Sequence, residues 1–308
     1  MQDHYEARRD TVAQLDGEFP TSIASHLIYY AKLVPEVARR RVLGRAYLKH
    51  NPQIRTSIEP ADVDRILKEL HKLNPKLTQE PYTVNLRDYN RWVSEARYPP
   101  LLYRVVRKEK YLEHFVSYDL LKPEPHATIV DVASFRSYFP KILRAKGCRV
   151  IVQDLVFPPG RNGDVLGGSA SAMELPDGSV DAMTLHCSFE HFEGDSDIGF
   201  IRESARILRP GGRVVILPLY LHQEYLTQAD PYYMSIGDIP MDAGATMVAV
   251  SGYANRHGRH YSPPAFLSRV HDVAVARGLH PILKLVKNAH EIAEYCYLKF
   301  ALVLNKRF

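Results

Sequence analysis

The 308-residue sequence predicts an α/β fold with a mostly parallel, seven-stranded sheet and helices on both of its faces. From residue 126 onward, short runs rich in β-branched residues alternate with amphipathic segments, which is the pattern of strands joined by crossover helices. The composition, 45% hydrophobic and 24% charged, is that of an ordinary globular protein. The chain is long enough for one large domain, or for one domain with a substantial extension.

The individual elements follow from apolar periodicity and from glycine and proline. Strands are expected at residues 127–132, 149–154, about 164–170, 180–186, 213–219, 280–286 and 295–305, and helices at about 137–146, 198–208 and 263–277. Gly147 and Gly278 are placed to end two of these helices, and Pro210-Gly211-Gly212 predicts a turn before the fifth strand.

The first part of the chain, residues 1–118, consists of helical segments broken by prolines. Helices are expected at about 22–48, from Glu59-Pro60 to Asn74, and over 101–121. We interpret residues 1–118 as a mostly helical N-terminal extension and residues 119–308 as the main domain. The extension suits a lid or a substrate-side element, and equally a structural or oligomer-forming appendage.

Two acidic residues close the first two strands of the predicted sheet. Asp131 and Asp154 lie at neighbouring carboxyl ends, where open α/β sheets bind their ligands. An acid at the end of the second strand is placed to accept hydrogen bonds from both hydroxyls of a nucleoside ribose. Acids at strand ends are common, so this pair alone is equally consistent with a structural role.

Two further segments make the pattern specific: GSASAMELPDGSVDAMTLHCSFEH (168–191) and RILRPGGRVVIL (206–217). With the two acids, the chain resembles the class I S-adenosylmethionine-dependent methyltransferases, in particular the type 11 subgroup. The resemblance covers about residues 114–220. It implies a Rossmann-like methyltransferase sheet and S-adenosylmethionine as the cofactor.

The sequence departs from the family pattern at two places. The usual glycine-rich loop reads DVASFRS, with Ala133, Phe135 and Ser137 where glycines are usual. Glycine there allows positive φ, so the loop either follows another path or binds the cofactor more weakly. Ser169 also replaces the acid that usually meets the adenine amino group.

The resemblance implies a role for each matching position. Asp131 and the backbone of Ala133, Ser134 and Phe135 would hold the methionine end, and Asp154 would hold the ribose. Leu155 would lie against adenine, with Ser169 and Ala170 at its edge.

Methylation of a hydroxyl requires a base, because an aliphatic hydroxyl does not ionise at neutral pH. His191 occupies the family's L-E-H histidine position and is our first candidate for this base, and His186 is the second. Packing or helix capping is the alternative role for His191. The H-x-x-x-E-H spacing is one residue longer than a zinc-protease motif, so no metal is expected.

Residues 221–262 form a predicted insertion after the fifth strand, and acceptor specificity usually resides on such loops. Tyr220, His222, Arg256 and Arg259 are our candidate substrate-binding residues, suited to a sugar, a phosphorylated sugar or a carboxylate. A basic surface loop is the alternative. Asp230-Pro231-Tyr232-Tyr233 is similar to the D-P-P-Y of base amino-methyltransferases, but it follows the wrong strand, and we interpret it as chance.

Charge and cysteine content narrow the class of protein. The net charge of +5 is too mild to favour a nucleic-acid partner. Three scattered cysteines fit reduced thiols in a cytoplasmic protein, and no segment is apolar enough for a signal peptide or a membrane span. The leading hypothesis is an O-methyltransferase acting on a glycan or other small molecule, with the oligomeric state left open. The alternatives are a catalytically lapsed cofactor-binding or partner-binding module, and an NAD-dependent oxidoreductase, which the absence of G-x-G-x-x-G disfavours.

Overall fold

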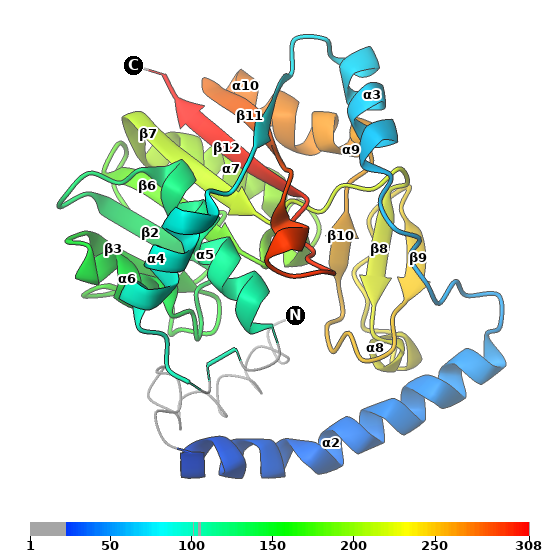
Figure 1. The fold of residues 1–308 in the computed structure, drawn as a ribbon. Coiled ribbons are helices and arrows are strands. Elements are labelled where there is room, and N and C mark those ends of the chain that lie inside the picture. The colour runs from blue at the N-terminus through cyan, green and yellow to red at the C-terminus, as the bar shows by residue number, and fades with distance from the viewer. Residues whose placement is uncertain (1–22, 101, 104–105, 308) are drawn as a thin grey trace.

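A computed structural model describes residues 23–100, 102–103 and 106–307, so the charged N-terminal stretch 1–22 lies outside the described residues. In the described part of the chain, strands form one nine-stranded sheet and one three-stranded sheet (Figure 1). The strand order of the large sheet is β1-β11-β12-β7-β6-β2-β3-β5-β4. Its strands are β1 (Thr78–Tyr82), β2 (Thr128–Val132), β3 (Arg149–Asp154), β4 (Gly160–Asn162), β5 (Val165–Gly167), β6 (Val180–His186), β7 (Leu208–Leu217), β11 (Leu279–Val286) and β12 (Phe300–Lys306).

The predicted mostly parallel sheet is confirmed. Strands β5, β3, β2, β6 and β7 run parallel to one another, β12 is antiparallel to both of its neighbours, and β4 pairs antiparallel with β5 at one edge. Strands β2 and β6 are nearly continuous runs of buried residues, as parallel strands covered on both faces require. Their carboxyl ends meet at one edge of the sheet.

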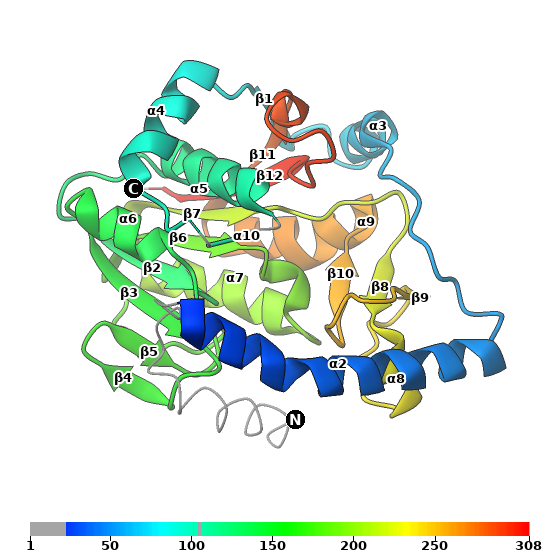
Figure 2. The ribbon, with the colours of Figure 1, turned by 60° about the horizontal axis from the view of Figure 1, so that its bottom comes forward.

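Helices cover both faces of the large sheet (Figure 2). One face packs against α4, α5 and α6, and the other against α3, α7 and the α9–α10 segment. The helical elements are α2 (Ile23–His50), α3 (Val63–Leu73), α4 (Leu86–Ala96), α5 (Arg107–Leu121), α6 (Phe139–Ala145), η1 (Phe189–His191), α7 (Ser196–Ile207), α8 (Pro231–Ser235), α9 (Pro263–Phe266), η2 (Leu267–His271), α10 (Asp272–Ala276) and η3 (Ala289–Glu291). None of these helices combines the length and the apolar character needed to cross a membrane.

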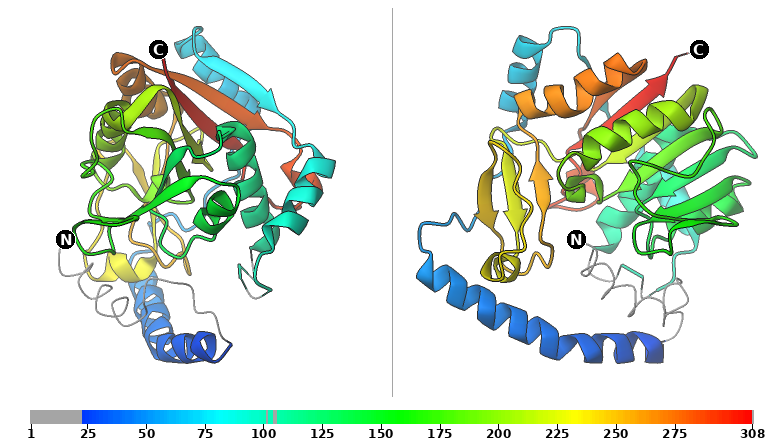
Figure 3. Two further views of the ribbon diagram at one scale, coloured as in Figure 1. Left: turned by 90° about the vertical axis from the view of Figure 1, so that its left-hand side faces the viewer. Right: turned by 180° about the vertical axis from the view of Figure 1, so that it is seen from behind.

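The predicted insertion folds into a small sheet of its own, with order β10-β8-β9, and the short helix α8. Its strands are β8 (Leu226–Ala229), β9 (Thr246–Ala249) and β10 (Gly258–His260). The long helix α2 lies across α8, as the rear view in Figure 3 shows. The Arg40 guanidinium donates to the Tyr233 hydroxyl of α8 at 3.0 Å. Asp230 caps α8 through the Tyr232 amide, so the D-P-Y-Y segment starts a helix.

The helical N-terminal extension is present, with two differences from the prediction. Strand β1 joins the large sheet beside β11. Helix α5 packs on β6 and β7, so the expected boundary at residue 118 falls inside a helix that covers the sheet. Helix α3 begins at Val63, not in the turn at Pro60. Asp62 is its N-cap residue, and the Asp62 side chain accepts a hydrogen bond from the Arg65 amide.

The predicted turn at Pro210-Gly211-Gly212 is instead a bulge within β7. The β6–β7 register passes from Val180–Leu208 to Ala182–Arg213, so the four residues 209–212 of β7 stand opposite Asp181 alone. A Cβ on Gly212 would lie 2.8 Å from the Asp181 carbonyl oxygen, which explains the glycine. The last strand, β12, begins at Phe300 rather than near residue 295.

Candidate functional site

Two adjoining cavities lie at the carboxyl ends of β2, β3 and β6. One, of about 260 Å³, contains Asp154 and Leu155 after β3 and His191 from η1. The other, of about 270 Å³, contains Asp131 and the loop after β2. Ala133 lines both, so together they form one crevice across the tips of β2 and β3. This is where a doubly wound α/β sheet offers its ligand site.

The second cavity, next to β2, contains buried polar atoms with no partner within the protein. Asp131 is 1% exposed, and its Oδ1 accepts from the Thr184 hydroxyl at 2.7 Å. Asp131 Oδ2, Ser134 Oγ and His186 Nε2 are buried without a hydrogen-bond partner among the described residues. An unsatisfied buried polar group is costly, so three around one cavity indicate a polar ligand. A charged amino acid end of a cofactor would supply such partners.

The loop after β2 follows a path that tolerates its missing glycines. Ala133 has φ of +51° and Arg136 has φ of +63°, whereas Phe135 lies outside the left-handed region. The positive φ values therefore fall at positions 133 and 136 of the loop, and the bulky Phe135 carries none of this strain. Its ring lies 6.2 Å from the ring of Phe157, and it lines only the cavity next to β2.

Asp154 connects this loop to the cavity next to β3. Its Oδ2 accepts from the Phe135 amide at 2.9 Å, and its Oδ1 accepts from the Val156 amide at 3.1 Å. Asp154 therefore orders the loop after β2 and also lines the cavity next to β3. Leu155, beside it, is 41% exposed, which provides an apolar surface in the same cavity.

The segment predicted at the adenine edge lies beside Asp154 but lines neither cavity. Strand β5 pairs with β3, and the Gly168 amide donates to the Asp154 carbonyl at 3.2 Å. Ala170 is 7% exposed, and the Ser169 hydroxyl accepts from the Ser171 amide. The roles of Ser169 and Ala170 stay predictions.

His191 is the cavity residue best placed for proton transfer. Its Nδ1 lies 2.7 Å from the His257 carbonyl oxygen, which can only accept, so Nδ1 carries the proton. In the neutral ring Nε2 is then unprotonated and able to act as a base. Nε2 lies 3.7 Å from Oε1 of Glu190, which is 6% exposed. Burial raises the pKa of Glu190 above its usual range.

His186, the second candidate base, faces the other cavity. Its Nδ1 lies 3.5 Å from Asp131 Oδ1, and its ring packs 4.7 Å from Phe139 and 5.1 Å from His114. The structure therefore separates the two histidines: His191 lies with Asp154, and His186 lies with Asp131.

A buried polar network behind the crevice has Glu113 of α5 at its centre. Its carboxylate, with 0% exposure, accepts from Lys110 at 3.1 Å, from Tyr297 at 2.6 Å and from the Cys187 thiol at 3.3 Å. Burial, and next the Glu113 charge, raise the pKa of Cys187 well above its usual range. The thiol therefore stays protonated and acts as a donor, not as a nucleophile.

Of the predicted substrate-binding residues, only Arg256 lines the crevice. Its guanidinium is held by Glu193 at 2.5 Å and by Asp238, so its charge is already neutralised.

The other three predicted residues have structural surroundings. Arg259 has 0% exposure and is bound by Asp242 and Asp197, and His222 is bound by the Glu59 carbonyl and the Glu224 amide. Tyr220 packs 5.2 Å from His260. Their placement does not support the predicted contact with an acceptor, because neither cavity includes them.

Sequence reasoning missed the contribution of α5 to the crevice. Tyr103, just before this helix, and Lys110 and His114, one turn apart on it, line the cavity next to β2. The available signal was the polar pair Glu113-His114 between the apolar residues Tyr111-Leu112 and Phe115-Val116. Within the described ranges, no three histidine, cysteine, aspartate or glutamate side chains are grouped so that they could hold a metal ion.

The doubly wound sheet and the polar crevice across β2 and β3 define a protein built to bind a nucleoside-type cofactor. Comparison with known families then makes the class specific. Residues 131–216 match the family model described as a methyltransferase domain. Over these residues the chain is similar to the S-adenosylmethionine-dependent methyltransferases, and its large, mostly parallel sheet confirms the predicted Rossmann-like fold.

Individual relatives are distant. A demethylmenaquinone methyltransferase of Corynebacterium kroppenstedtii is 30% identical over 125 residues, which cover 36% of this chain and 54% of the relative. The chain thus spans about half the length of that curated relative. Among solved structures, a 1,6-didemethyltoxoflavin-N1-methyltransferase of Burkholderia thailandensis is 14% identical, with 83% and 95% of the two chains covered and a TM-score of 0.42. The PH0226 protein of Pyrococcus horikoshii is 14% identical, with 78% and 99% covered and a TM-score of 0.43.

The crevice fits the cofactor of this class. Asp131 Oδ2 and Ser134 Oγ are the unpartnered polar atoms suited to its amino acid end. Asp154 and Leu155 offer a carboxylate and an apolar surface side by side, which suit a ribose and a base.

Proposed function

We propose that this protein is a methyltransferase that transfers a methyl group from S-adenosylmethionine to a hydroxyl of a sugar, glycan or other small molecule, with His191 as the base. The bound cofactor supplies an already activated methyl group. The protein must then align the acceptor, which is worth several kcal/mol, and remove one proton.

The observation that carries the base role is the hydrogen bond from His191 Nδ1 to the His257 carbonyl at 2.7 Å. It fixes the tautomer in which Nε2 is the basic nitrogen, on a residue that lines the same cavity as Asp154. A positioned base of this kind contributes on the order of 10²–10⁴-fold.

Charge in the cavity next to β3 favours a neutral acceptor over a phosphorylated or carboxylated one. Arg256, the cavity's arginine, is paired with both Glu193 and Asp238, and Asp154 adds a further carboxylate. An anionic acceptor would meet net negative charge in a partly buried site, where repulsion is poorly screened. A hydroxyl compound without charge meets no such penalty.

The test uses S-adenosylmethionine labelled in its methyl group and three matched acceptors: methyl glucoside, glucose 6-phosphate and glucuronate. We expect labelled product with the neutral sugar and at least tenfold less with the two anions. His191→Ala should lower turnover at least tenfold while the affinity for S-adenosylhomocysteine stays within twofold. The exposed His290→Ala is the matched control.

Unchanged turnover in His191→Ala would remove this residue from the base role. A preference for an anionic acceptor would contradict the assignment of substrate class. The lapsed-module alternative is motivated by Phe135 and Ser169. It predicts that calorimetric titration with S-adenosylhomocysteine gives no binding to the folded protein, whereas the proposal predicts micromolar binding.

A further inference from the structure

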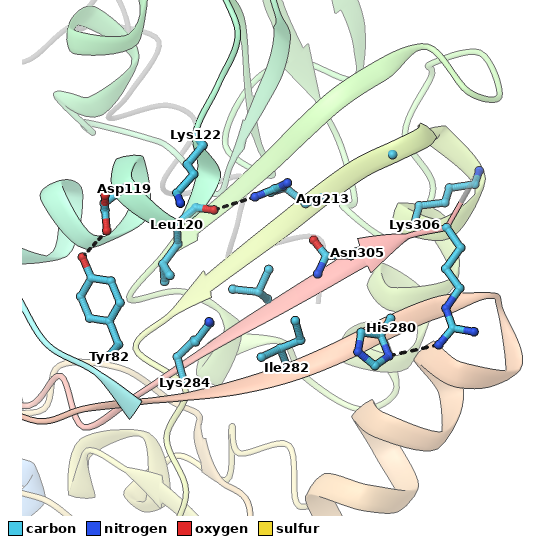
Figure 4. Close-up of a pocket in the computed structure, with 13 residues that line it drawn as sticks. Tyr82, Asp119, Leu120, Lys122, Arg213, His280, Ile282, Lys284, Asn305 and Lys306 are labelled. Atoms are coloured by element: carbon cyan, nitrogen blue, oxygen red, sulfur yellow. Dashed lines mark hydrogen bonds between the residues drawn. The ribbon is translucent and has the colours of Figure 1, made fainter. Parts of the chain in front are cut away.

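A second hollow, of about 510 Å³, lies at the opposite end of β7 from the crevice. It is lined by Gly211 and Arg213 near the start of β7, by residues of β11 and β12, and by the end of α5. The crevice begins where β6 ends, at His186, which pairs with Leu217 at the other end of β7. We call this second hollow the β7 groove (Figure 4).

The sheet face is open here because α5 ends. The helix finishes at Leu121, and Lys122 takes a left-handed conformation with φ of +45° that turns the chain away. Apolar side chains that would otherwise be covered then form the floor of the groove. Ile282 is half-buried, and Val303 and Leu120 are nearly buried beside it.

The walls of the groove are strongly cationic. Five lining residues carry a positive charge, against a single carboxylate, Asp119, which accepts from the Tyr82 hydroxyl at 2.7 Å. Figure 4 shows Lys122, Arg213, Lys284, Lys306 and His280 set around the same open sheet face. The five are Lys122, Arg213, Lys284, Lys306 and Arg307.

Three of these cations also have partners within the fold. The Lys306 ammonium donates to the backbone carbonyls of Ala205 and Leu208. The Arg213 guanidinium donates to the backbone carbonyl of Leu120. Lys284 forms an ion pair with Glu80.

The other two cations are more available. Lys122 is exposed, and none of the described residues forms an ion pair with it. Arg307 is exposed, and its guanidinium lies 3.4 Å from Nδ1 of His280, with no ion pair to any residue that the structure describes. Two positive charges that line the groove are therefore available to an external partner.

We propose that the β7 groove binds a small organic anion with a flat apolar body. The apolar body would pack on Ile282 and Val303, and the anionic group would bind Lys122 and Arg307. A hollow of this size lies within the range of small-molecule sites, which combine an apolar lining with a few placed polar groups. The anionic class follows from charge complementarity, because an excess of cations around a partly closed hollow raises the local concentration of anions. This site is separate from the proposed methyl-transfer site.

The experiment is isothermal titration of the full chain, saturated with S-adenosylhomocysteine, with three probes: 2-naphthyl phosphate, 2-naphthol and inorganic phosphate. We expect 2-naphthyl phosphate to bind saturably and at least tenfold more tightly than either fragment. The double variant Lys122→Gln/Arg307→Gln, which changes two exposed side chains, should weaken binding at least fivefold. The double variant Arg277→Gln/Lys287→Gln removes the same charge from exposed positions outside the groove and should stay within twofold of the wild type.

The possible contrary results are distinct. Equal binding of 2-naphthol would show an apolar surface with no anion selectivity. Equal weakening of binding by both double variants would show that the overall positive charge of the protein, and not a defined site, attracts the probe. Absence of saturable binding to the wild type would overturn the proposal outright. None of these results bears on methyl transfer, because the cofactor crevice is filled throughout. If S-adenosylhomocysteine itself fails to bind, that failure concerns the proposed function alone, and the groove variants still report on the probes.

Discussion

At the scale of single residues, burial decides what the chemistry of the crevice can be. Glu190 is 6% exposed, and its Oε2 has no hydrogen-bond partner among the described residues. Burial raises the pKa of this carboxyl above its usual range, because ionisation would leave a poorly solvated charge. The Nε2 atom of His191, its neighbour, lies 3.7 Å from Glu190 Oε1.

Glu190 gives a pH dependence of stability whose sign is fixed. Burial raises its pKa in the folded state above 4.5, so the unfolded chain releases this proton at lower pH than the folded chain. Above about pH 4.5 the folded state binds more protons, and the free energy of unfolding therefore falls as pH rises, until the folded-state pKa is passed. Urea unfolding from pH 4 to 8 should show this loss in the wild type relative to Glu190→Gln. If the difference between the two proteins is constant with pH, the pKa of Glu190 is not raised by folding.

At the scale of elements, the loop between β3 and β4 positions the cofactor side of the crevice. It carries Leu155 and Val156 into the cavity and crosses β5 at close range. A Cβ on Gly167 would lie 1.8 Å from the Pro158 carbonyl oxygen, so only glycine allows the loop to lie against the strand.

Gly167→Ala should therefore damage both stability and cofactor binding. The added methyl group meets backbone, which must move, at a cost of about 1–3 kcal/mol in the free energy of unfolding. The displaced loop should weaken S-adenosylhomocysteine binding at least fivefold, measured by calorimetry. Val165→Ala, on the same short strand but 36% exposed, is the control and should change both quantities little. Wild-type affinity in a folded Gly167→Ala protein would show that this loop does not shape the site.

Most elements of the sheet could be predicted because each strand is a short apolar run bounded by turns. The runs 149–154 and 180–186 match β3 and β6 at both ends. The strand β1 was missed because TQEPY has neither apolar alternation nor β-branched enrichment, and it gains its place only by pairing with β11. The insertion's three strands are short, and two of them pair only with strands of the insertion itself.

At the scale of the whole molecule, the two parts of the chain build one crevice. The strand ends supply Asp131 and Asp154, which sequence position alone could place. The helix α5 supplies Lys110 and His114 from the N-terminal half, and the insertion supplies Arg256. Such long-range contacts leave no local pattern in the sequence. The same holds for the pairing of Arg256 with Glu193 and Asp238, which leaves an expected anion-binding arginine outnumbered by carboxylates.

The most direct test is calorimetric titration of S-adenosylhomocysteine into the wild type, Asp154→Asn and Asp164→Asn, with thermal unfolding as a check on folding. Asp154 lines the crevice, whereas Asp164 has a side chain that is 69% exposed and serves as the matched control. We expect micromolar binding to the wild type and to the Asp164→Asn control. Binding to Asp154→Asn should be at least tenfold weaker, because a charge-assisted hydrogen bond is worth about 1.5–3 kcal/mol. Equal affinity in all three proteins, or no binding to a folded wild type, would contradict a nucleoside held at the tips of β2 and β3.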